Sequence, residues 1–163
     1  MDNKKVLDVC CASKGMWFDK QDKRVLYLDK RNAEYKLKRN AAYPSGAVIK
    51  IKPDIVGDFT DIKQPDNSFW HVVFDPPHIK RNSMSGNITK YYGRLEDGWE
   101  DMIKKGFEEC FRVLKPNGPL VFKWSSVQFP IKDVLKLTKH KPLYGHKSGK
   151  RANTHWVCFI KDN

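Results

Sequence analysis

Four hydrophobic runs in the first half of the sequence each carry an aspartate at or just beyond their carboxyl end. The runs have the length of β-strands and are apolar at most positions, a pattern typical of parallel strands buried on both faces. Because the carboxyl ends of parallel strands meet at one edge of a sheet, these aspartates point to a ligand site there. The runs are Lys5–Cys10, which contains Asp8, then Arg24–Asp29, Asp54–Asp58, and Phe69–Phe74, which Asp75 follows.

The second half of the sequence continues the alternation of helices and strands. Apolar residues recur at helical spacing from Trp99 to Leu114, and Lys115–Gly118 then breaks the helix. This order predicts an α/β fold with a mixed sheet of about seven strands, parallel except near the C-terminal end, flanked by helices. The remaining predicted segments are a strand at 120–124, a short helix at 131–138, strands around 139–144 and 155–160, and a basic turn at 145–151.

The length of 163 residues suits a single domain, so residues 1–163 are expected to form one domain that recognises its substrate through loops. No apolar stretch reaches the roughly 20 residues of a membrane span, and the polar start does not resemble a signal peptide, so we expect a cytoplasmic protein. Adjacent Cys10 and Cys11 match no zinc-ligand spacing. Four free cysteines and no metal are therefore predicted.

The net charge predicts the class of partner. The 31 lysine and arginine residues exceed the 19 aspartate and glutamate residues and give a formal charge of +12. Such a field attracts polyanions, so nucleic acid is the expected partner, although a basic surface can also serve solubility alone. The region Lys30–Lys52 is basic and weakly patterned, so the helix expected there would be short or missing.

A long polar segment, Ile79–Gly98, is predicted to be a substrate-binding loop, because loops of this length in compact domains are usually functional or disordered. Its tyrosines would stack on bases and its cations would hold phosphates, unless the tyrosine pair packs against its own protein. The predicted substrate-binding residues are Lys80, Arg81, Tyr91 and Tyr92, with help from the segment Lys147–Arg151.

The first hydrophobic run leads into small residues, where a nucleotide-binding fold turns tightly beneath its ligand. The segment reads Cys10-Cys11-Ala12-Ser13-Lys14-Gly15, so most of the glycines usual at such a turn are replaced. We expect this turn to contact a nucleotide-containing ligand.

Two further aspartates are candidates for the same ligand. Asp29 follows Asp8 by 21 positions, a separation that suits a carboxylate bonded to ribose hydroxyls, unless Asp29 pairs with a basic residue at 30 or 31. Asp58, after a glycine turn, can accept a hydrogen bond from an adenine amino group while the amide of Phe59 donates to a ring nitrogen.

Asp75-Pro76-Pro77-His78 is the most specific motif in the chain. The two prolines lack amide donors, so this rigid turn offers a ligand only acceptors. The Asp75 carboxylate and the Pro76 carbonyl oxygen would accept the two hydrogens of an exocyclic amino group, which favours a pyramidal nitrogen with an available lone pair. The His78 ring would stack on the base.

These motifs, in this order, resemble the class I methyltransferases that depend on S-adenosylmethionine (SAM). Leu7–Ala12 resembles the first SAM motif of that family, Asp29 the ribose acid, and Val56–Phe59 the adenine-contact segment; Phe111–Gly118 is similar to the turn into the fifth strand. Residues 75–78 resemble the fourth motif of enzymes that methylate adenine N6 or cytosine N4, with histidine in place of the usual tyrosine, phenylalanine or tryptophan.

The resemblance implies a Rossmann-like domain that binds SAM and transfers its methyl group to an amino nitrogen of DNA or RNA, with Asp75, Pro76, Pro77 and His78 as the catalytic residues. Because the chain has no room for a separate recognition region, the resemblance favours RNA, a short or single-stranded site, or target recognition through a partner protein. A protein glutamine or a small molecule is the alternative acceptor, and a noncatalytic nucleic-acid-binding domain is the alternative class. The implied SAM-binding residues are Asp8, Cys10, Cys11, Ala12, Ser13, Asp29, Asp58 and Phe59.

Overall fold

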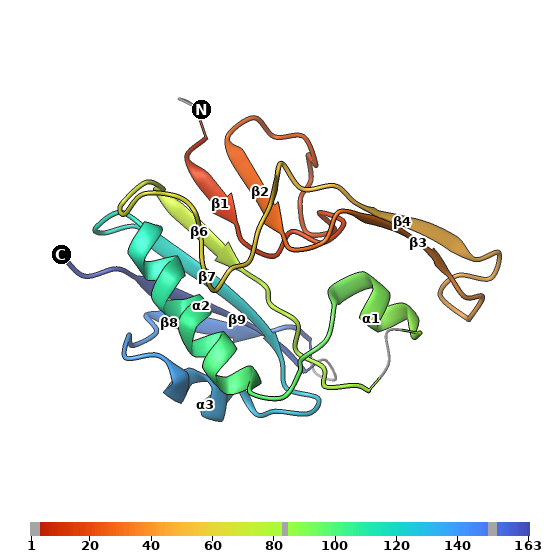
Figure 1. Cartoon of the computed structure of the whole chain (residues 1–163). Helices are drawn as coiled ribbons and strands as arrows, with labels where there is room; N and C mark the ends of the chain where they lie inside the picture. The colour runs from red at the N-terminus through yellow and green to blue at the C-terminus, as the bar shows by residue number, and fades with distance from the viewer. Residues whose placement is uncertain (1–3, 83–84, 150–152) are drawn as a thin grey trace.

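The computed structural model describes residues 4–82, 85–149 and 153–163, and its centre is a seven-stranded sheet (Figure 1). The strands lie in the order β5-β2-β1-β6-β7-β9-β8. The predicted α/β fold with a mixed, mostly parallel sheet is therefore confirmed. The strands are β1 (Val6–Asp8), β2 (Val25–Asp29), β5 (Ile55–Val56), β6 (His71–Phe74), β7 (Pro119–Ser125), β8 (Tyr144–Lys147) and β9 (Thr154–Ile160).

The parallel part of the sheet runs from β5 to β7, and only the C-terminal strands are antiparallel. Neighbouring strands pair in parallel from β5 through β2, β1 and β6 to β7, whereas β9 runs antiparallel to both β7 and β8. The carboxyl ends of β1, β2 and β6 consequently lie at the same edge. The segments that follow Asp8, Asp29 and Phe74 therefore emerge side by side.

Helix α2 (Trp99–Val113) covers one face of the sheet, with α3 (Ile131–Val134) and a 3₁₀ turn (Leu135–Leu137) beside it (Figure 1). The buried side chains of β7 alternate along the strand, and the Phe122 ring lies 4.8 Å from the Phe107 ring of α2. A Cβ atom at Gly106 would lie 2.6 Å from the Phe74 ring. Only glycine therefore lets α2 approach the sheet this closely.

The connection between β1 and β2 covers the opposite face near these strands. Residues 9–24 form turns and no helix. Side chains of β2 alternate between the faces, so Leu26 and Leu28 join the core under α2 while Val25 and Tyr27 join a smaller cluster with Cys11. The Trp17 ring packs edge-on against Tyr27, with ring centroids 5.5 Å apart.

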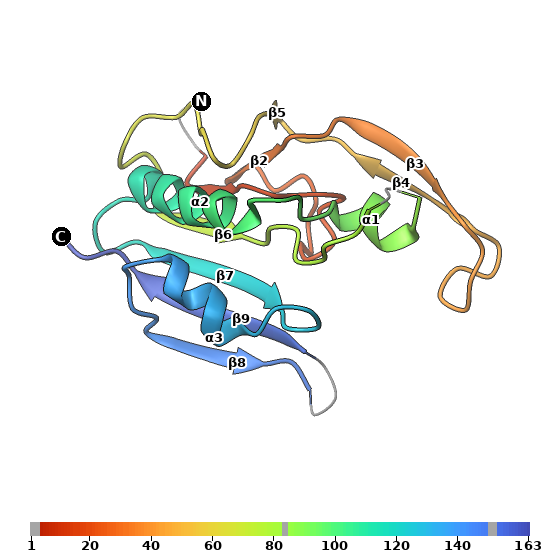
Figure 2. The same ribbon diagram turned by 60° about the horizontal axis from the view of Figure 1, so that its bottom comes forward.

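A β-hairpin takes the place in the chain where a short or missing helix was expected. Strands β3 (Ala33–Leu37) and β4 (Ala47–Ile51) pair antiparallel in a separate two-stranded sheet. Ile49 and Ile51 are buried while Val48 and Lys50 are exposed, the alternation of a half-buried strand. The hairpin extends beyond the main sheet (Figures 1 and 2).

Two other predictions are corrected. The predicted loop Ile79–Gly98 contains a short helix, α1 (Asn87–Tyr92). The strand expected around 139–144 begins only at Tyr144, because Pro142 has no amide to donate to a strand partner, and β8 then occupies part of the predicted basic turn. Of the predicted substrate segment Lys147–Arg151, residues 150 and 151 lie outside the described residues. None of the described helices has the length and apolar character needed to cross a membrane.

Candidate functional site

A pocket of about 250 Å3 lies where β1 and β6 end. The loop after β1 forms one wall, the residue after β6 forms the floor, and α1, β7 and β9 complete the lining. Six of the predicted site residues meet here. The lining residues are Cys10, Cys11, Ala12, Gly15, Met16, Asp75, Tyr91, Tyr92, Lys123 and Trp156.

Asp8 is fully buried and fixes the loop after β1 from within. Its carboxylate accepts hydrogen bonds from the Cys10 amide at 3.2 Å and from the Trp17 indole Nε1 at 2.7 Å. Burial raises the pKa of Asp8 from 3.8 to about 7, and the Trp17 hydrogen bond opposes this rise. Asp8 is not among the residues that line the pocket, so its contacts make it a support for the loop.

The loop after β1 keeps a glycine-like backbone without the usual glycines. Ala12 and Lys14 have φ values of 46° and 57°, in the left-handed region that glycine occupies without strain. Ala12 and Lys14, which stand where glycines are usual at such a turn, therefore preserve the tight turn but strain the backbone.

Asp29 joins this loop to the segment after β2. Its carboxylate accepts from the Ala12 amide at 2.9 Å, from the Arg31 amide at 2.9 Å, and from the Arg31 guanidinium at 3.0 and 3.1 Å. These four donors use the four acceptor positions of a carboxylate. The pairing with a neighbouring cation, considered above as an alternative to a ligand role, is present, although Asp29 is only 4% exposed.

Asp75 directly follows β6 and forms a buried ion pair with Lys123 of β7. The Lys123 Nζ lies 2.6 Å from Asp75 Oδ2, and the side chains are 19% and 7% exposed. Burial raises the pKa of Asp75, and the Lys123 ammonium opposes this rise. Among the residues that the structure describes, two buried side-chain oxygens lack a hydrogen-bond partner: Asp75 Oδ1 and Ser13 Oγ.

His78 lies beside the pocket lining and packs against Tyr92 and Trp124, with ring centroids 5.7 and 6.2 Å apart. Its Nδ1 lies 3.3 Å from the carbonyl oxygen of Pro76. The Pro76 carbonyl oxygen, which was predicted to accept a hydrogen bond from the substrate, is therefore within hydrogen-bonding distance of the His78 ring. Burial lowers the pKa of His78, which favours the neutral imidazole.

Tyr91 and Tyr92 of α1 close one side of the pocket. Their rings lie 4.6 Å apart, and a Cβ atom at Gly15 would lie 2.7 Å from the Tyr91 hydroxyl. The lack of a side chain at Gly15 thus leaves room for the Tyr91 hydroxyl beside the loop after β1.

The other predicted site residues lie away from this pocket. Asp58 is exposed, and its carboxylate accepts hydrogen bonds from the amide and hydroxyl of Thr60. The Phe59 ring is buried against Phe74 in the core. Lys80 and Arg81 line a separate hollow with Arg94, Leu95, Glu96 and Asp97. Their predicted ligand contacts stay predictions.

Sequence reasoning missed Lys123 and Trp156. They are directly opposite each other on β7 and β9, and Lys123 Nζ lies 5.5 Å from the centre of the Trp156 ring. The only sequence signal for Lys123 is a lysine within the hydrophobic run 120–124. Such a lysine needs a partner when it is buried.

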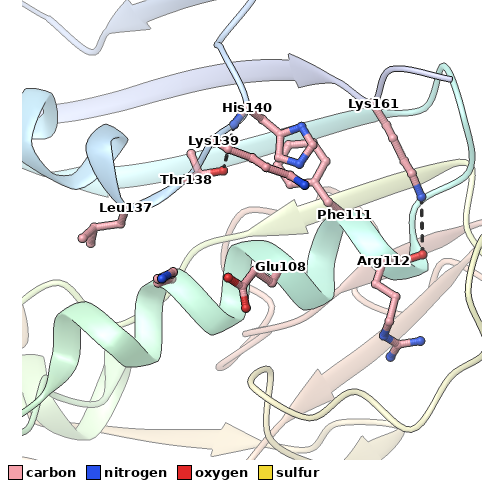
Figure 3. Close-up of a pocket in the computed structure, with 9 residues that line it drawn as sticks. Glu108, Phe111, Arg112, Leu137, Thr138, Lys139, His140 and Lys161 are labelled. Atoms are coloured by element: carbon pink, nitrogen blue, oxygen red, sulfur yellow. Dashed lines mark hydrogen bonds between the residues drawn. The ribbon is translucent and has the colours of Figure 1, made fainter.

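A hollow of about 500 Å3 lies elsewhere, between α2 and the chain around His140 (Figure 3). The His140 ring stacks on Phe111 at 3.5 Å between centroids. Two cations of this hollow are held by the chain itself, since Arg112 binds Glu109 and Asp66 and Lys161 donates to carbonyl oxygens. None of the predicted site residues lines this hollow. We therefore place the candidate site at the ends of β1 and β6.

The cysteines agree with expectation, since all four are free thiols. Burial raises the pKa of Cys10 and Cys110 well above the ordinary value, so these thiols are not nucleophiles activated by their surroundings.

No protein-family model matches the sequence, and no curated protein matches it either. Solved structures match over nearly the whole chain. A protein from Pyrococcus horikoshii is 15% identical with a TM-score of 0.59, over 96% of this chain and 81% of that one. A TehB-like SAM-dependent methyltransferase from Corynebacterium glutamicum is 13% identical with a TM-score of 0.57, over 98% and 81%. The N-methyltransferase NodS from Bradyrhizobium japonicum is 13% identical with a TM-score of 0.55, over 97% and 85%. At these identities the similarity establishes the fold alone.

Proposed function

We propose that this chain transfers the methyl group of SAM to an exocyclic amino nitrogen of a nucleic acid base. The observation that carries the proposal is the carboxylate of Asp75. One of its oxygens is ion-paired with Lys123, while the other is buried in the pocket lining without a donor among the described residues. Buried polar groups are rarely left unpaired, so this oxygen calls for a ligand that donates a hydrogen bond.

The methionine end of SAM suits the residues present. The turn at Cys10–Ala12 lines the pocket, and the unpaired Ser13 hydroxyl lies next to it. At the ribose end, Asp29 has to release at least one Arg31 contact before it accepts from a hydroxyl. The pocket of about 250 Å3 is also below the roughly 300 to 1,000 Å3 of most ligand sites. The pocket as it stands would therefore hold only part of the cofactor.

The cofactor supplies a methyl group on a positively charged sulfur, whose bonding electron pair returns to the sulfur on transfer. Asp75 Oδ1 accepts one N–H of the acceptor amino group and so aims the nitrogen lone pair at the methyl carbon. The nitrogen then loses one proton, which the Asp75 carboxylate would accept. The Lys123 ammonium would favour the ionised carboxylate for this role.

The acceptor is assigned to nucleic acid because of the net charge of +12 and the tyrosines at the pocket. A protein glutamine or a small molecule carries the same kind of nitrogen and is the second candidate acceptor. A noncatalytic nucleic-acid-binding domain explains the charge but gives no reason for the Asp75 and Lys123 pair.

Calorimetric titration with SAM and with S-adenosylhomocysteine tests the cofactor, and transfer of a labelled methyl group to RNA and DNA oligonucleotides tests the reaction. Asp75→Ala should lose transfer while SAM affinity stays near that of the wild type, because the carboxylate acts on the acceptor. Asp75→Asn keeps an acceptor oxygen and should retain more activity.

Asp133→Ala serves as the matched control, since Asp133 is an exposed aspartate paired with Lys136 on the surface. Failure of both SAM and S-adenosylhomocysteine to bind would overturn the proposal. Parallel loss of SAM affinity and of transfer in folded Asp75→Ala would remove Asp75 from the acceptor site.

A further inference from the structure

Half of the net charge of the protein is carried by the segment 30–52, which contains the β3–β4 hairpin. Residues 30–52 contain seven lysines or arginines and a single acid, Glu34, which gives +6 of the formal +12. The hairpin takes the chain position between β2 and β5 and extends beyond the main sheet (Figure 2). This charge lies outside the segments predicted to bind substrate.

A groove of about 610 Å3 runs between β4 of the hairpin and the loop after β1. Four lysines line it, and its described lining contains no acid. Two tyrosines, Tyr43 and Tyr91, lie among these cations, and both are half-buried. Glu34 forms only a solvent-exposed pair with Lys50, at 3.4 Å, which neutralises little of the field. The lysines are Lys14, Lys20, Lys50 and Lys52.

The groove reaches the candidate active site at Tyr91, which lines both hollows. Helix α1, which carries Tyr91, is bonded directly to the hairpin. The Asn87 side chain exchanges two hydrogen bonds with the Lys38 backbone, at 2.7 and 2.8 Å, and Lys90 Nζ donates to the Lys36 carbonyl at 2.9 Å. A chain lying in the groove would therefore pass the wall of the catalytic pocket.

We propose that this groove holds the sugar-phosphate backbone of a single-stranded nucleic acid and leads one of its bases past Tyr91 to Asp75. The inference rests on the proposed function and names the surface that serves it. Lysines alone would suit any polyanion. Tyrosines interleaved with lysines favour a nucleic acid, because bases stack on aromatic rings while cations neutralise phosphates. An acidic peptide offers no such stacking surface.

The test is the salt dependence of binding to a fluorescent single-stranded oligonucleotide, followed by anisotropy. The groove variant is the triple substitution Lys20→Ala, Lys50→Ala and Lys52→Ala. If the three lysines contact phosphates, the slope of log K against log salt should fall by about 2, and affinity in 0.1 M salt should fall about 100-fold.

The control variant removes the same charge from the far side: Lys104→Ala, Lys105→Ala and Lys139→Ala, all exposed. Its slope should stay near that of the wild type. If oligonucleotide affinity fell equally in the two variants, the groove proposal would be overturned, because net charge alone would then explain binding. Absence of oligonucleotide binding by the wild type would also overturn it, and binding of polyglutamate instead would point to an acidic protein.

Titration of the groove variant with SAM separates this inference from the proposed function. Normal SAM affinity with weak oligonucleotide binding supports the groove. Failure of SAM to bind the wild type would contradict the proposed methyltransferase function. The salt dependence of oligonucleotide binding would still test the groove. Methyl transfer that is unaffected in the groove variant at subsaturating oligonucleotide would contradict the path to Asp75.

Discussion

The aspartates at the strand ends do four different things, although they look alike in the sequence. Asp8 is buried and ties down the loop after β1, and Asp29 is saturated by the chain's own donors. Asp58 is exposed and bonds Thr60. Only Asp75 combines a buried position in the pocket lining with a carboxylate oxygen that lacks a partner. The proposed chemistry of this edge is therefore expected to depend on Asp75 and its partner Lys123.

Replacing Lys123 by methionine should shift the pH dependence of methyl transfer. Loss of the ammonium raises the pKa of Asp75 further, so the acid limb of the rate profile should move to higher pH. SAM affinity at alkaline pH should change little. Initial rates across pH 5 to 9 measure this, and Lys123→Arg should restore the wild-type limb. An unmoved limb in the methionine variant would show that Asp75 ionisation does not control the rate.

Asp8 should make the protein lose stability as the pH rises. Its folded pKa of about 7 exceeds the ordinary 3.8, so the folded state binds more protons between about pH 4 and pH 7 and its unfolding free energy falls through that range. The fall corresponds to about 4 kcal/mol. In Asp8→Asn this contribution is absent.

Urea unfolding of the two proteins at several pH values measures the difference between them. The difference between the two proteins is the quantity to follow, because four histidines with lowered pKa values titrate in a similar pH range. These histidines make the folded state more stable as the pH rises, which is opposite to the effect of Asp8. If the difference in unfolding free energy between the two proteins were the same at pH 4 and pH 7, it would contradict a raised pKa for the buried Asp8.

At the level of elements, the strands of the main sheet other than β8 could be predicted because each is a hydrophobic run bounded by turns, and α2 because its apolar residues follow helical spacing. The β3–β4 hairpin escaped prediction because it packs only partly on the core, so charged residues such as Lys36 and Lys50 interrupt its pattern. Asp75, Cys10 and the tyrosines could be assigned to one site from sequence. The pairing of Asp75 with Lys123 could not, because it depends on the register of β6 with β7.

The strain in the turn after β1 predicts that a glycine in place of Ala12 would stabilise the protein. Ala12 has a φ of 46°, which costs an L residue roughly 1 to 2 kcal/mol relative to the right-handed region. Ala12→Gly should therefore stabilise the fold by up to about 1 kcal/mol after the added freedom of the unfolded chain is subtracted. Ala33→Gly, in the regular strand β3, should instead destabilise by about 0.5 to 1 kcal/mol. Chemical denaturation of both variants tests the sign, and destabilisation by both would contradict a strained Ala12.

For the whole molecule, the sheet, the pocket and the basic groove divide the work. Helix α2 and the aromatic core cover one face of the sheet, while the proposed cofactor and substrate sites use connections at the carboxyl edge. Three connections between parallel strands of the sheet lack a helix: the turns of 9–24, the β3–β4 hairpin and residues 57–70. The first two border the groove, so two of the connections without a helix create the proposed nucleic-acid surface.

Ligand binding at this edge should stabilise the entire fold, since the pocket exists only when β1, β6 and α1 are assembled. A ligand at 100 times its dissociation constant adds about 2.7 kcal/mol, which raises Tm by about 5 to 11 °C for a protein of this size. We expect this rise with excess S-adenosylhomocysteine, measured by thermal unfolding, and expect adenosine alone to give less. Asp75→Ala should show a similar rise, because its carboxylate serves the acceptor, whereas a variant that lost the rise along with transfer would move Asp75 into the cofactor site.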